Sequence, residues 1–447
     1  REDVNGKFSL VLSNGIYIDS PNLKAALQNQ IRRLAAIRNP IFYKNAAIGM
    51  SNFATAQWIY LGKDHLSGYI EIPRGLYNRL IEKIKEADIP FEISDERQCG
   101  RHINVTFAGE LRQEQKPALE EMMKYDNGIL QAATAFGKTV VCSAMIAEKK
   151  VNTLIILESS ALLEQWKDAL EKFLDIDEKL PEYKTKTGRI RVRKSLIGKL
   201  QGAHDSMTGI VDIAMAGSLC KKGEWHPLLD QYGMVIVDEC HHAASDTIAE
   251  VLQKVTAKYV YGVTATPKRS DGLEKINYML LGPIRYSYSA KEKVKAQGIP
   301  HLVSPRFTRT VLPRGVTAEE LIMATPVSFR SVVEQYAGRL NRNYAGKKDV
   351  IVFDYVDSHI PMFERMYGKR LKAYKQIGYE ICCGLDREKQ ETNAIFDSEN
   401  YKEVFRRDLL EAEQRIVISS NVISAKKVYE IINILKENQA LGIEVSI

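Results

Sequence analysis

The sequence has no long apolar run and few cysteines. A helix that spans a bilayer needs about 20 consecutive apolar residues, and no stretch of the 447 residues approaches that length, so we expect no membrane partner. The chain opens on the polar stretch Arg1–Asn5, where we expect no signal peptide. Its six cysteines never occur as Cys-x-x-Cys. This spacing argues against a disulfide framework or a zinc site and predicts reduced thiols in a cytoplasmic protein.

The sequence also lacks internal repeats, low-complexity tracts and a large excess of one charge. Its formal net charge is +7 and its pI is near 8.8. Such a mild excess of positive charge suits a polyanionic partner without requiring one. The length predicts about three domains.

A strand, a tight loop and a helix are predicted in succession around residues 128–147. The loop Ala132–Thr139 ends in Gly-Lys-Thr. Gly137 lets the backbone approach a phosphate, and the helix N-terminus supplies N–H donors. Lys138 would reach the outer phosphates, and the Thr139 hydroxyl would ligate Mg²⁺. The full pattern begins with Gly where this chain has Ala132, and an ordinary strand–helix connection is the alternative. The predicted nucleotide-binding residues of the loop are Thr134, Ala135, Phe136, Gly137, Lys138 and Thr139.

A second apolar strand, residues 233–237, delivers two adjacent carboxylates, Asp238 and Glu239. The carboxyl ends of parallel strands are where open α/β sheets bind ligands. Asp238 would hold Mg²⁺, which prefers hard oxygen ligands, and Glu239 would orient and activate a water molecule. His241 could sense the outer phosphate. His241 and His242 could suggest zinc, but adjacent helical positions do not face one point.

Three further positions have side chains that suit a nucleotide site. Gln115 offers a donor and an acceptor, as the adenine edge requires. Thr264 and Thr266 follow the predicted strand 258–263. Their hydroxyls could link two moving surfaces, and a plain turn before Pro267 is the alternative.

The predicted helix 333–342 carries two arginines three residues apart. Arg339 and Arg342 therefore share one helix face. Two guanidinium groups on one face can clamp a transferring phosphoryl group from a neighbouring lobe. Gln335 lies on the same helix and joins them as a catalytic candidate.

Two basic stretches could contact nucleic acid. Residues 184–194 contain six cations and no acid. Arg189, Arg191 and Arg193 alternate, so on a strand they would share a face that could track phosphates. A solvated surface is the equal alternative. Near the N-terminus, basic residues lie beside aromatic ones, a pattern that suits nucleic acid, although we favour a solvated helix face. These residues are Arg32, Arg33, Arg38, Phe42, Tyr43 and Lys44.

In their order, these motifs resemble those of superfamily 2 helicases. The segments that resemble the Q, I, II, III and VI motifs are Gln115, Ala132–Thr139, Asp238–His241, Thr264–Thr266 and Gln335–Arg342. Residues 238–242 and 264–272 resemble the XPB-like branch. The whole length is most similar to the helicases of TOTE conflict systems, where a primase-like module precedes the helicase and a phospholipase D-like nuclease module follows it. The resemblance implies ATP and Mg²⁺ as cofactors.

The implied fold is α/β, with two RecA-like parallel-sheet lobes, an N-terminal α+β domain and a C-terminal partial βαβ module. The implied domains are an accessory domain at 1–108, lobe 1 at 109–290, lobe 2 at 291–381, a linker at 382–403 and the start of the phospholipase D-like module at 404–447. The segment between Lys291 and Gln335 shows neither motif IV nor motif V. We therefore expect an incomplete lobe 2, interrupted between Thr310 and Leu321. The His-x-Lys of phospholipase D-like nucleases is absent, so nuclease activity cannot be assigned to these residues.

The resemblance implies an ATP-dependent helicase or translocase that acts on double-stranded DNA, in a mobile-element conflict or antiviral defence system. Catalysis would rest on Glu239, Gln335, Arg339 and Arg342, and coupling on His241, Thr264 and Thr266. DNA would contact Gln165, Arg189, Arg191 and Arg193. One alternative is a non-catalytic helicase-like scaffold that recruits a nuclease or primase. Another is a nuclease that an ATPase only regulates.

Overall fold

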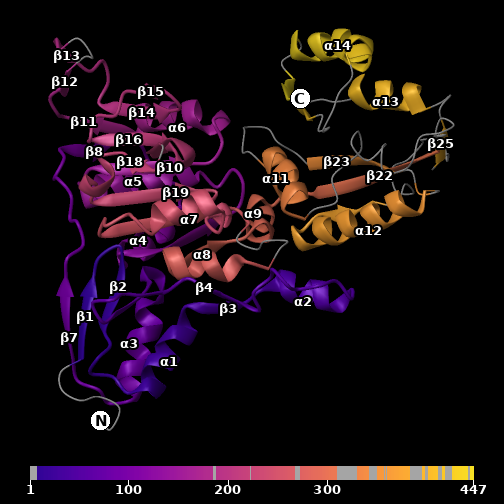
Figure 1. Cartoon of the computed structure of the whole chain (residues 1–447). Coiled ribbons are helices and arrows are strands. Elements are labelled where there is room, and N and C mark those ends of the chain that lie inside the picture. Colours follow the sequence, from indigo (N-terminus) through magenta and orange to yellow (C-terminus); the bar gives the residue numbers. More distant parts are fainter. Residues whose placement is uncertain are drawn as a thin grey trace. The chain divides into compact units, whose positions relative to one another are not determined.

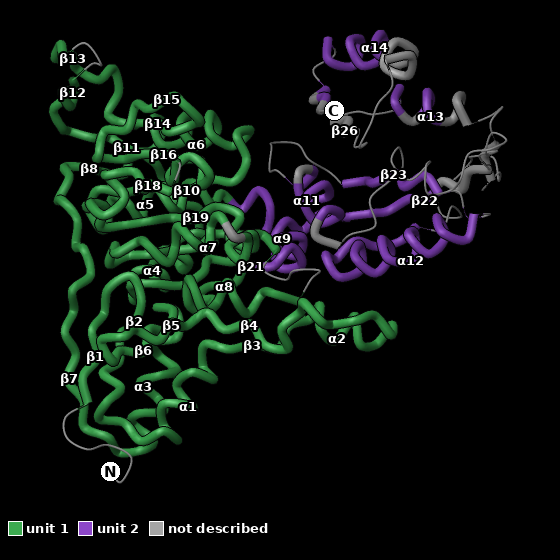
Figure 2. Tube along the Cα trace, in the orientation of Figure 1, with its two compact units in different colours: residues 1–132, 137–287 green, residues 133–136, 288–447 purple. Residues whose placement is uncertain are grey.

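The computed structural model describes residues 8–184, 188–221, 223–266, 272–309, 330–341, 350–356, 358, 360–382, 395–397, 401–410, 415–417, 425–440 and 443–446. The chain divides into two compact units, residues 1–132 with 137–287, and residues 133–136 with 288–447 (Figure 2). Within the described residues, no helix combines the length and apolar character that a membrane crossing requires.

The N-terminal part of the first unit is a five-stranded sheet covered by two helices (Figure 1). The strand order is β5-β6-β2-β1-β7. These strands are β1 (Phe8–Leu12), β2 (Gly15–Asp19), β5 (Lys63–Asp64), β6 (Tyr69–Pro73) and β7 (Phe91–Asp95). Helices α1 (Ala25–Leu34) and α3 (Tyr77–Glu86) bury their apolar faces in the same core. The two helices lie within stretches 22–37 and 75–87, whose apolar residues recur at helical spacing.

A short antiparallel ribbon and a helix extend from this sheet domain. The ribbon pairs β3 (Ala36–Arg38) with β4 (Trp58–Tyr60), and α2 (Pro40–Ala47) lies between them in the chain. Figure 1 shows α2 at the end of this extension. The helix has no buried residue, so its amphipathic pattern contributes little to the core.

An eight-stranded sheet forms the rest of the first unit, with the order β15-β14-β16-β10-β19-β20-β9-β21. From β14 to β9, neighbouring strands are parallel. The strands are β9 (Asn127–Ala132), β10 (Thr153–Leu157), β14 (Ile197–Gln201), β15 (His204–Asp205), β16 (Val211–Met215), β19 (Met234–Asp238), β20 (Tyr259–Thr264) and β21 (Ile284–Tyr288). Strands β10 and β19 are buried along their whole length. Such continuous apolar strands are typical of parallel sheets covered on both faces, so the predicted α/β class is confirmed.

Helices and small ribbons complete this lobe. The helices are α4 (Lys116–Met123), α5 (Lys138–Lys149), α6 (Ala161–Phe173), α7 (Asp246–Leu252) and α8 (Glu274–Leu281). The ribbons pair β8 (Val105–Phe107) with β11 (Leu174–Ile176), β12 (Glu182–Lys184) with β13 (Ile190–Val192), and β17 (Cys220–Lys221) with β18 (Glu224–Trp225). Short 3-10 helices span Arg74–Leu76, Ala216–Ser218, Leu229–Gln231 and Cys240–His242. Residues 102–107 alternate like a strand in the sequence, but only Val105–Phe107 form one.

The N-terminal sheet domain is fastened to the lobe through Arg74 and Gly75. The Arg74 guanidinium is buried and donates to the carbonyl oxygens of Asn14, Ser13, Val255 and Ala257. A side chain at Gly75 would collide with the backbone of α8 at Tyr278 and Met279, so only glycine allows this approach. The two sheets also share one hydrophobic core.

The second unit contains a four-stranded parallel sheet around β22 (His301–Arg309). Its partners are β23 (Val350–Val356), β24 (Glu380–Ile381) and β25 (Ile395–Asp397). Helices α9 (Ala290–Gln297), α11 (Arg330–Leu340) and α12 (Pro361–Gln376) belong to the same unit. Asp354 on β23 accepts a buried bidentate ion pair from Arg370 on α12. The expected interruption between Thr310 and Leu321 lies outside the described residues.

The end of the chain has the predicted strand–helix–strand order. Strand β26 (Arg415–Val417) pairs in parallel with β27 (Glu444–Ser446), and α14 (Ala425–Ala440) connects them. Helix α13 (Tyr401–Leu410) precedes them and packs on α14 through Leu409 and Leu435. Strand β25 lies inside the stretch 382–403 whose polar composition predicted a linker.

Candidate active site

The predicted phosphate loop connects β9 to α5, as the sequence pattern indicates. Ala135 and Gly137 have φ values of 62° and 86°, in the left-handed region. The Gly137 N–H and carbonyl flank the first turn of α5, and Val140 N donates to Gly137 O. A Cβ on Gly137 would lie 2.5 Å from the Gln115 amide nitrogen. The loop therefore needs glycine here both for its backbone conformation and for its contact with Gln115.

Gln115 lies beside the loop, where the sequence placed it as a nucleotide ligand. Its side chain is buried, and its Oε1 accepts a hydrogen bond from Arg112 N at 2.9 Å. This bond fixes the orientation of the amide. Phe136 is different from the other predicted loop ligands because its ring is buried and lies 5.0 Å from that of Tyr288. Only its backbone could face a nucleotide.

Asp238 ends β19 with a carboxylate that is almost fully buried, the residue being 8% exposed. Trp166 Nε1 donates to Asp238 Oδ2 at 2.7 Å, and Glu239 N donates to Oδ1 at 2.8 Å. Burial raises the pKa of this carboxyl, which the charge of Lys138 partly offsets. A bound cation would favour the ionised form, so the group suits a metal ligand.

Glu239, which follows β19, and Lys138, which begins α5, are brought together by the fold. Lys138 Nζ lies 3.4 Å from Glu239 Oε1, although 101 residues separate them in the chain. Burial by itself would raise the pKa of Glu239. The hydrogen bond from His241 and the charge of Lys138 outweigh that effect and lower the pKa to about 2. The carboxylate is therefore ionised at neutral pH and able to accept a hydrogen bond from water.

His241 and Thr264 extend this cluster onto the next strand, β20. His241 Nδ1 lies 3.3 Å from Glu239 Oε2 and 3.0 Å from Thr264 Oγ1. Thr266 N in turn donates to Thr264 Oγ1 at 3.1 Å. The Thr266 hydroxyl is buried and has no hydrogen-bond partner among the described residues. Asp238, Glu239, His241 and both threonines thus form one connected set, as their predicted roles require.

The donor set fits Mg²⁺ and a nucleotide phosphate. Asp238 and Glu239 offer the hard oxygen ligands that Mg²⁺ prefers. Lys138 supplies a positive charge for a phosphate, and Gly137 lets a phosphate approach the backbone because it has no side chain. His242 turns away from this set, with its Nδ1 3.3 Å from Glu158 Oε2. Among the described residues, no group of three or more His, Cys, Asp or Glu side chains is arranged to hold a metal.

Two supporting residues were not predicted as functional. Trp166 was visible only as an apolar helix position beside Gln165, and Arg112 only as a neighbour of Gln115. Their roles depend on hydrogen bonds to Asp238 and Gln115 that no sequence spacing reveals. No signal in the sequence links Trp166 to Asp238, because 72 residues separate them.

The remaining predicted residues lie apart from this cluster or outside the described residues. Gln335 is on α11, the Arg339 side chain is not among those described, and Arg342 lies outside the described residues. Gln165 is exposed on α6. Arg189 and Arg191 are exposed on the β12–β13 hairpin, whereas Arg193 is partly buried.

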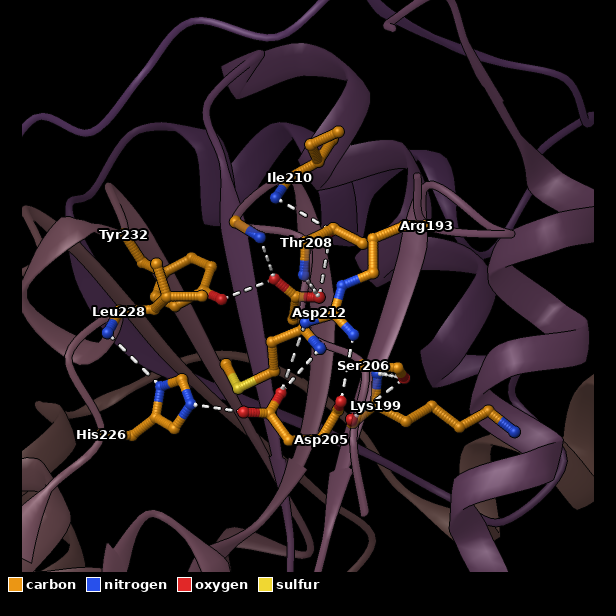
Figure 3. Close-up of polar contacts among 12 residues, drawn as sticks. Arg193, Lys199, Asp205, Ser206, Thr208, Ile210, Asp212, His226, Leu228 and Tyr232 are labelled. Carbon is orange, nitrogen blue, oxygen red and sulfur yellow. Dashed lines mark hydrogen bonds and ion pairs between the residues drawn. The ribbon is translucent and has the colours of Figure 1, made fainter. Parts of the chain in front are cut away.

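Figure 3 shows Arg193 directed at Asp205 on β15. Its guanidinium donates to Asp205 O at 3.0 Å and lies 4.3 Å from the centre of the Tyr183 ring. Nearby, the buried Asp212 accepts hydrogen bonds from Thr208 N and Gly209 N, and from the hydroxyl of Tyr232. Arg193 therefore fastens the hairpin to the lobe, and Arg189 and Arg191 are left as its outward cations.

Comparison with known proteins shows what the part of the chain that carries this site is similar to. Residues 108–269 match the family described as "Type III restriction enzyme, res subunit". The chain is 32% identical over 183 residues to DNA 3'-5' translocase XPB2 of Sulfurisphaera tokodaii, covering 41% of this chain and 37% of that protein. It is 24% identical over 335 residues to DNA 3'-5' helicase XPB of Kineococcus radiotolerans, covering 70% and 54%.

Among solved structures, T4 UvsW matches with a TM-score of 0.45 and 13% identity, covering 88% of this chain and 99% of that one. The chain spans 37% and 54% of the lengths of the two curated relatives. The sequence matches and the geometry around Lys138 and Glu239 agree: the chain is similar to the superfamily 2 helicases over residues 108–269. Within that superfamily, the two relatives named above are an XPB-type translocase and an XPB helicase.

Proposed function

We propose that the chain hydrolyses ATP with Mg²⁺ and uses the energy to move along or open double-stranded DNA. The observation that carries this proposal is the cluster of Lys138, Asp238 and Glu239 at the carboxyl ends of β9 and β19. Relatives named as DNA translocase and DNA helicase support the same activity. The cluster contains a cation that can bind phosphate, a carboxylate that can bind a metal ion, and an ionised carboxylate that can orient water. Phosphoryl transfer to water requires groups of these three kinds.

Each residue of the cluster has a proposed role. Gln115 binds the base, and residues 134–139 bind the phosphates. Thr139 and Asp238 hold Mg²⁺, which neutralises developing charge when bound. Glu239 orients the attacking water and accepts its proton, and His241 keeps the Glu239 carboxylate in place. Thr264 and Thr266 transmit the state of the site, because Thr264 is hydrogen-bonded to His241 and Thr266 N donates to the Thr264 hydroxyl.

The proposed DNA contacts are Gln165 and the exposed end of the β12–β13 hairpin. The hairpin presents Arg189 and Arg191, and its backbone is fixed through Arg193. Cations held on a defined ribbon suit a phosphate backbone, which supplies most of the affinity of nucleic-acid binding. Arg339, Arg342 and Gln335 are proposed to complete the hydrolytic site from the second unit.

We further propose a cytoplasmic setting in a mobile-element conflict or defence system, with primase or nuclease modules as partners. The free thiols of the five described cysteines suit a reducing compartment. The parallel pairing of β26 with β27 suits the start of a phospholipase D-like module. Retention of the chain on an immobilised primase or nuclease of such a system would support this setting, and a failure to bind both would contradict it.

The activity is tested by ATP turnover with and without double-stranded DNA. DNA should stimulate turnover in the parent. Lys138→Ala should abolish it, and Glu239→Gln should bind ATP but turn it over about 10²–10⁴-fold more slowly, the usual cost of losing a general base. Matched controls are Lys254→Ala and Glu250→Gln, which change exposed residues of the same unit. Parental rates in Lys138→Ala or Glu239→Gln would refute the assignment. DNA binding without any turnover in the parent would favour the scaffold alternative.

A further inference from the structure

Residues 36–60 form an extension, here called the arm, that consists of β3, α2, the following loop and β4. Half of the exposed large hydrophobic residues among those described lie on the arm. They are Ile41, Tyr43, Ile48, Met50, Phe53, Trp58 and Tyr60. Phe53 is fully exposed and Trp58 is 50% exposed. Single exposed apolar side chains are normal on a protein surface, whereas a cluster of them indicates a binding surface. The arm carries such a cluster.

The charge around the arm selects a polyanion as its partner. Residues 20–63 contain six basic residues and no acidic residue. Arg38 lies 5.8 Å from the centre of the Tyr43 ring and 5.9 Å from that of Trp58. An apolar peptide would need no such charge, whereas nucleic acid requires cations for its phosphates and flat rings for its bases.

A groove of about 970 Å³ adjoins the base of the arm. Its lining includes the cations Arg33, Arg38, Arg79 and Lys275, with Trp58 among the lining residues and Glu274 as the acidic one. The four cations are all exposed. The volume is at the upper end of the range for small-molecule pockets, which leaves room for more than one nucleotide.

Local hydrogen bonds hold the backbone of the arm and the hydroxyl of Tyr43 in place. Asn39 caps α2 through Ile41 N and donates to Ala56 O at 2.8 Å. Asn52 donates to Phe42 O, and Gln57 donates to the Tyr43 hydroxyl at 3.1 Å. A surface whose backbone is already fixed loses little backbone entropy when a ligand binds to it.

We propose that the arm and its groove bind single-stranded nucleic acid. Tyr43, Phe53 and Trp58 stack on unpaired bases, and the cations of the groove contact the phosphates. The proposal rests on the nucleic-acid function proposed above and gives it a second, strand-specific site, distinct from the cluster around Glu239. Stacking favours unpaired bases because bases within a duplex already stack on one another.

Tryptophan fluorescence provides a test that needs no ATP. Of the three tryptophans, Trp166 is buried and Trp225 is partly buried, so Trp58 should report on stacking. Titration with a short oligothymidylate should quench the parent. Trp58→Phe should lose most of the quenching but keep an affinity within about twofold, since Phe still stacks. The double variant Phe53→Ala with Trp58→Ala should bind about tenfold or more weakly.

Controls separate this site from the duplex contacts and from the ATP site. Leu66→Ala, which truncates an exposed residue of the same domain, should leave affinity unchanged. Blunt duplex should bind the double variant as it binds the parent, and the thermal unfolding midpoints should agree. Parental oligothymidylate affinity in the double variant would overturn the proposal. If the double variant instead lost self-association and kept its DNA affinity, the proposal would also be overturned, and the arm would be a protein interface. A lack of ATP turnover would refute only the hydrolytic function.

Discussion

At the residue scale, Glu239 is held in an unusual state. Its backbone φ is 45°, in the left-handed region that non-glycine residues rarely adopt. Its carboxylate lies within 3.4 Å of Lys138, His241 and Thr264. Backbone strain of this kind costs on the order of 1–3 kcal/mol and persists only where surrounding contacts support it. The polar partners of the carboxylate provide that support and hold it toward Lys138.

The low pKa of Glu239 predicts a defined pH dependence of stability. Its value is about 2 in the folded protein against 4.5 ordinarily. The ionised group therefore stabilises the fold above pH 4.5. This contribution is lost as the pH falls through the window between 4.5 and about 2. The difference in free energy of unfolding between the parent and Glu239→Gln should shrink by roughly 2–3 kcal/mol across that window.

Urea denaturation of both proteins at several values between about pH 6 and about pH 3 measures this difference. Glu250→Gln is the matched control, because Glu250 is an exposed residue of α7. It should show no comparable change. A difference between the parent and Glu239→Gln that stays constant with pH would contradict the predicted coupling of Glu239 to Lys138 and His241.

At the scale of elements, the arginines of the β12–β13 hairpin have two different roles, stabilising the hairpin and contacting DNA, which the sequence alone does not distinguish. The alternation of Arg189, Arg191 and Arg193 predicts three equivalent cations on one face. The structure holds Arg193 against Asp205 and Tyr183, so this residue stabilises the hairpin. If all three were substituted, weaker DNA binding could result either from lost DNA contacts or from a destabilised hairpin.

Neutralising only Arg189 and Arg191 to Gln should weaken DNA binding without loosening the hairpin. We expect affinity for duplex DNA to fall about five- to tenfold, and the slope of log K against log salt to decrease by about 2, because each phosphate contact releases about one counterion. ATP binding without DNA should not change. Fluorescence anisotropy at several salt concentrations measures both effects. Gln substitutions at the exposed Lys83 and Lys85 of α3 serve as the charge-matched control. An unchanged slope would mean that Arg189 and Arg191 are solvated surface residues and do not contact DNA.

At the scale of the whole molecule, the candidate catalytic residues are divided between two compact units. Lys138, Asp238 and Glu239 belong to the first, and α11 with Gln335 and Arg339 belongs to the second. Residues 133–136 of the phosphate loop are grouped with the second unit, where Ala133 N donates to Tyr288 O and Lys293 donates to Thr134 O.

The proposed arginines should act on hydrolysis rather than on ATP binding. Arg339→Ala or Arg342→Ala should lower ATP turnover about 10³-fold or more, the usual effect of losing an arginine that stabilises the transferring phosphoryl group. Nucleotide affinity, measured with a fluorescent ATP analogue, should change little. Arg406→Ala, at an exposed position of α13, is the control. If both arginine variants keep the parental rate, the second unit does not contribute the catalytic cations.

Much of the fold follows from sequence pattern. The apolar runs that became β9, β10, β16, β19 and β20 are buried strands, and the loop after β9 begins a helix at Lys138 as predicted. Boundaries were less certain, because residues 102–104 alternate like a strand but form only an isolated bridge at His102. The strand β25 was hidden in a polar stretch, since short strands carry little periodic signal.

The sequence by itself determined the local chemistry of this protein: the Gly-Lys-Thr loop, the carboxylates after β19 and the basic stretches. These features depend on residues that are neighbours in the chain, so spacing is enough to reveal them. Only the tertiary structure decided that Lys138 meets Glu239, that Trp166 supports Asp238, and that the aromatic residues of the arm face solvent. The physical reason is that such contacts depend on strand order and on what covers each surface. Both arise from packing between distant segments, whose burial no local pattern specifies.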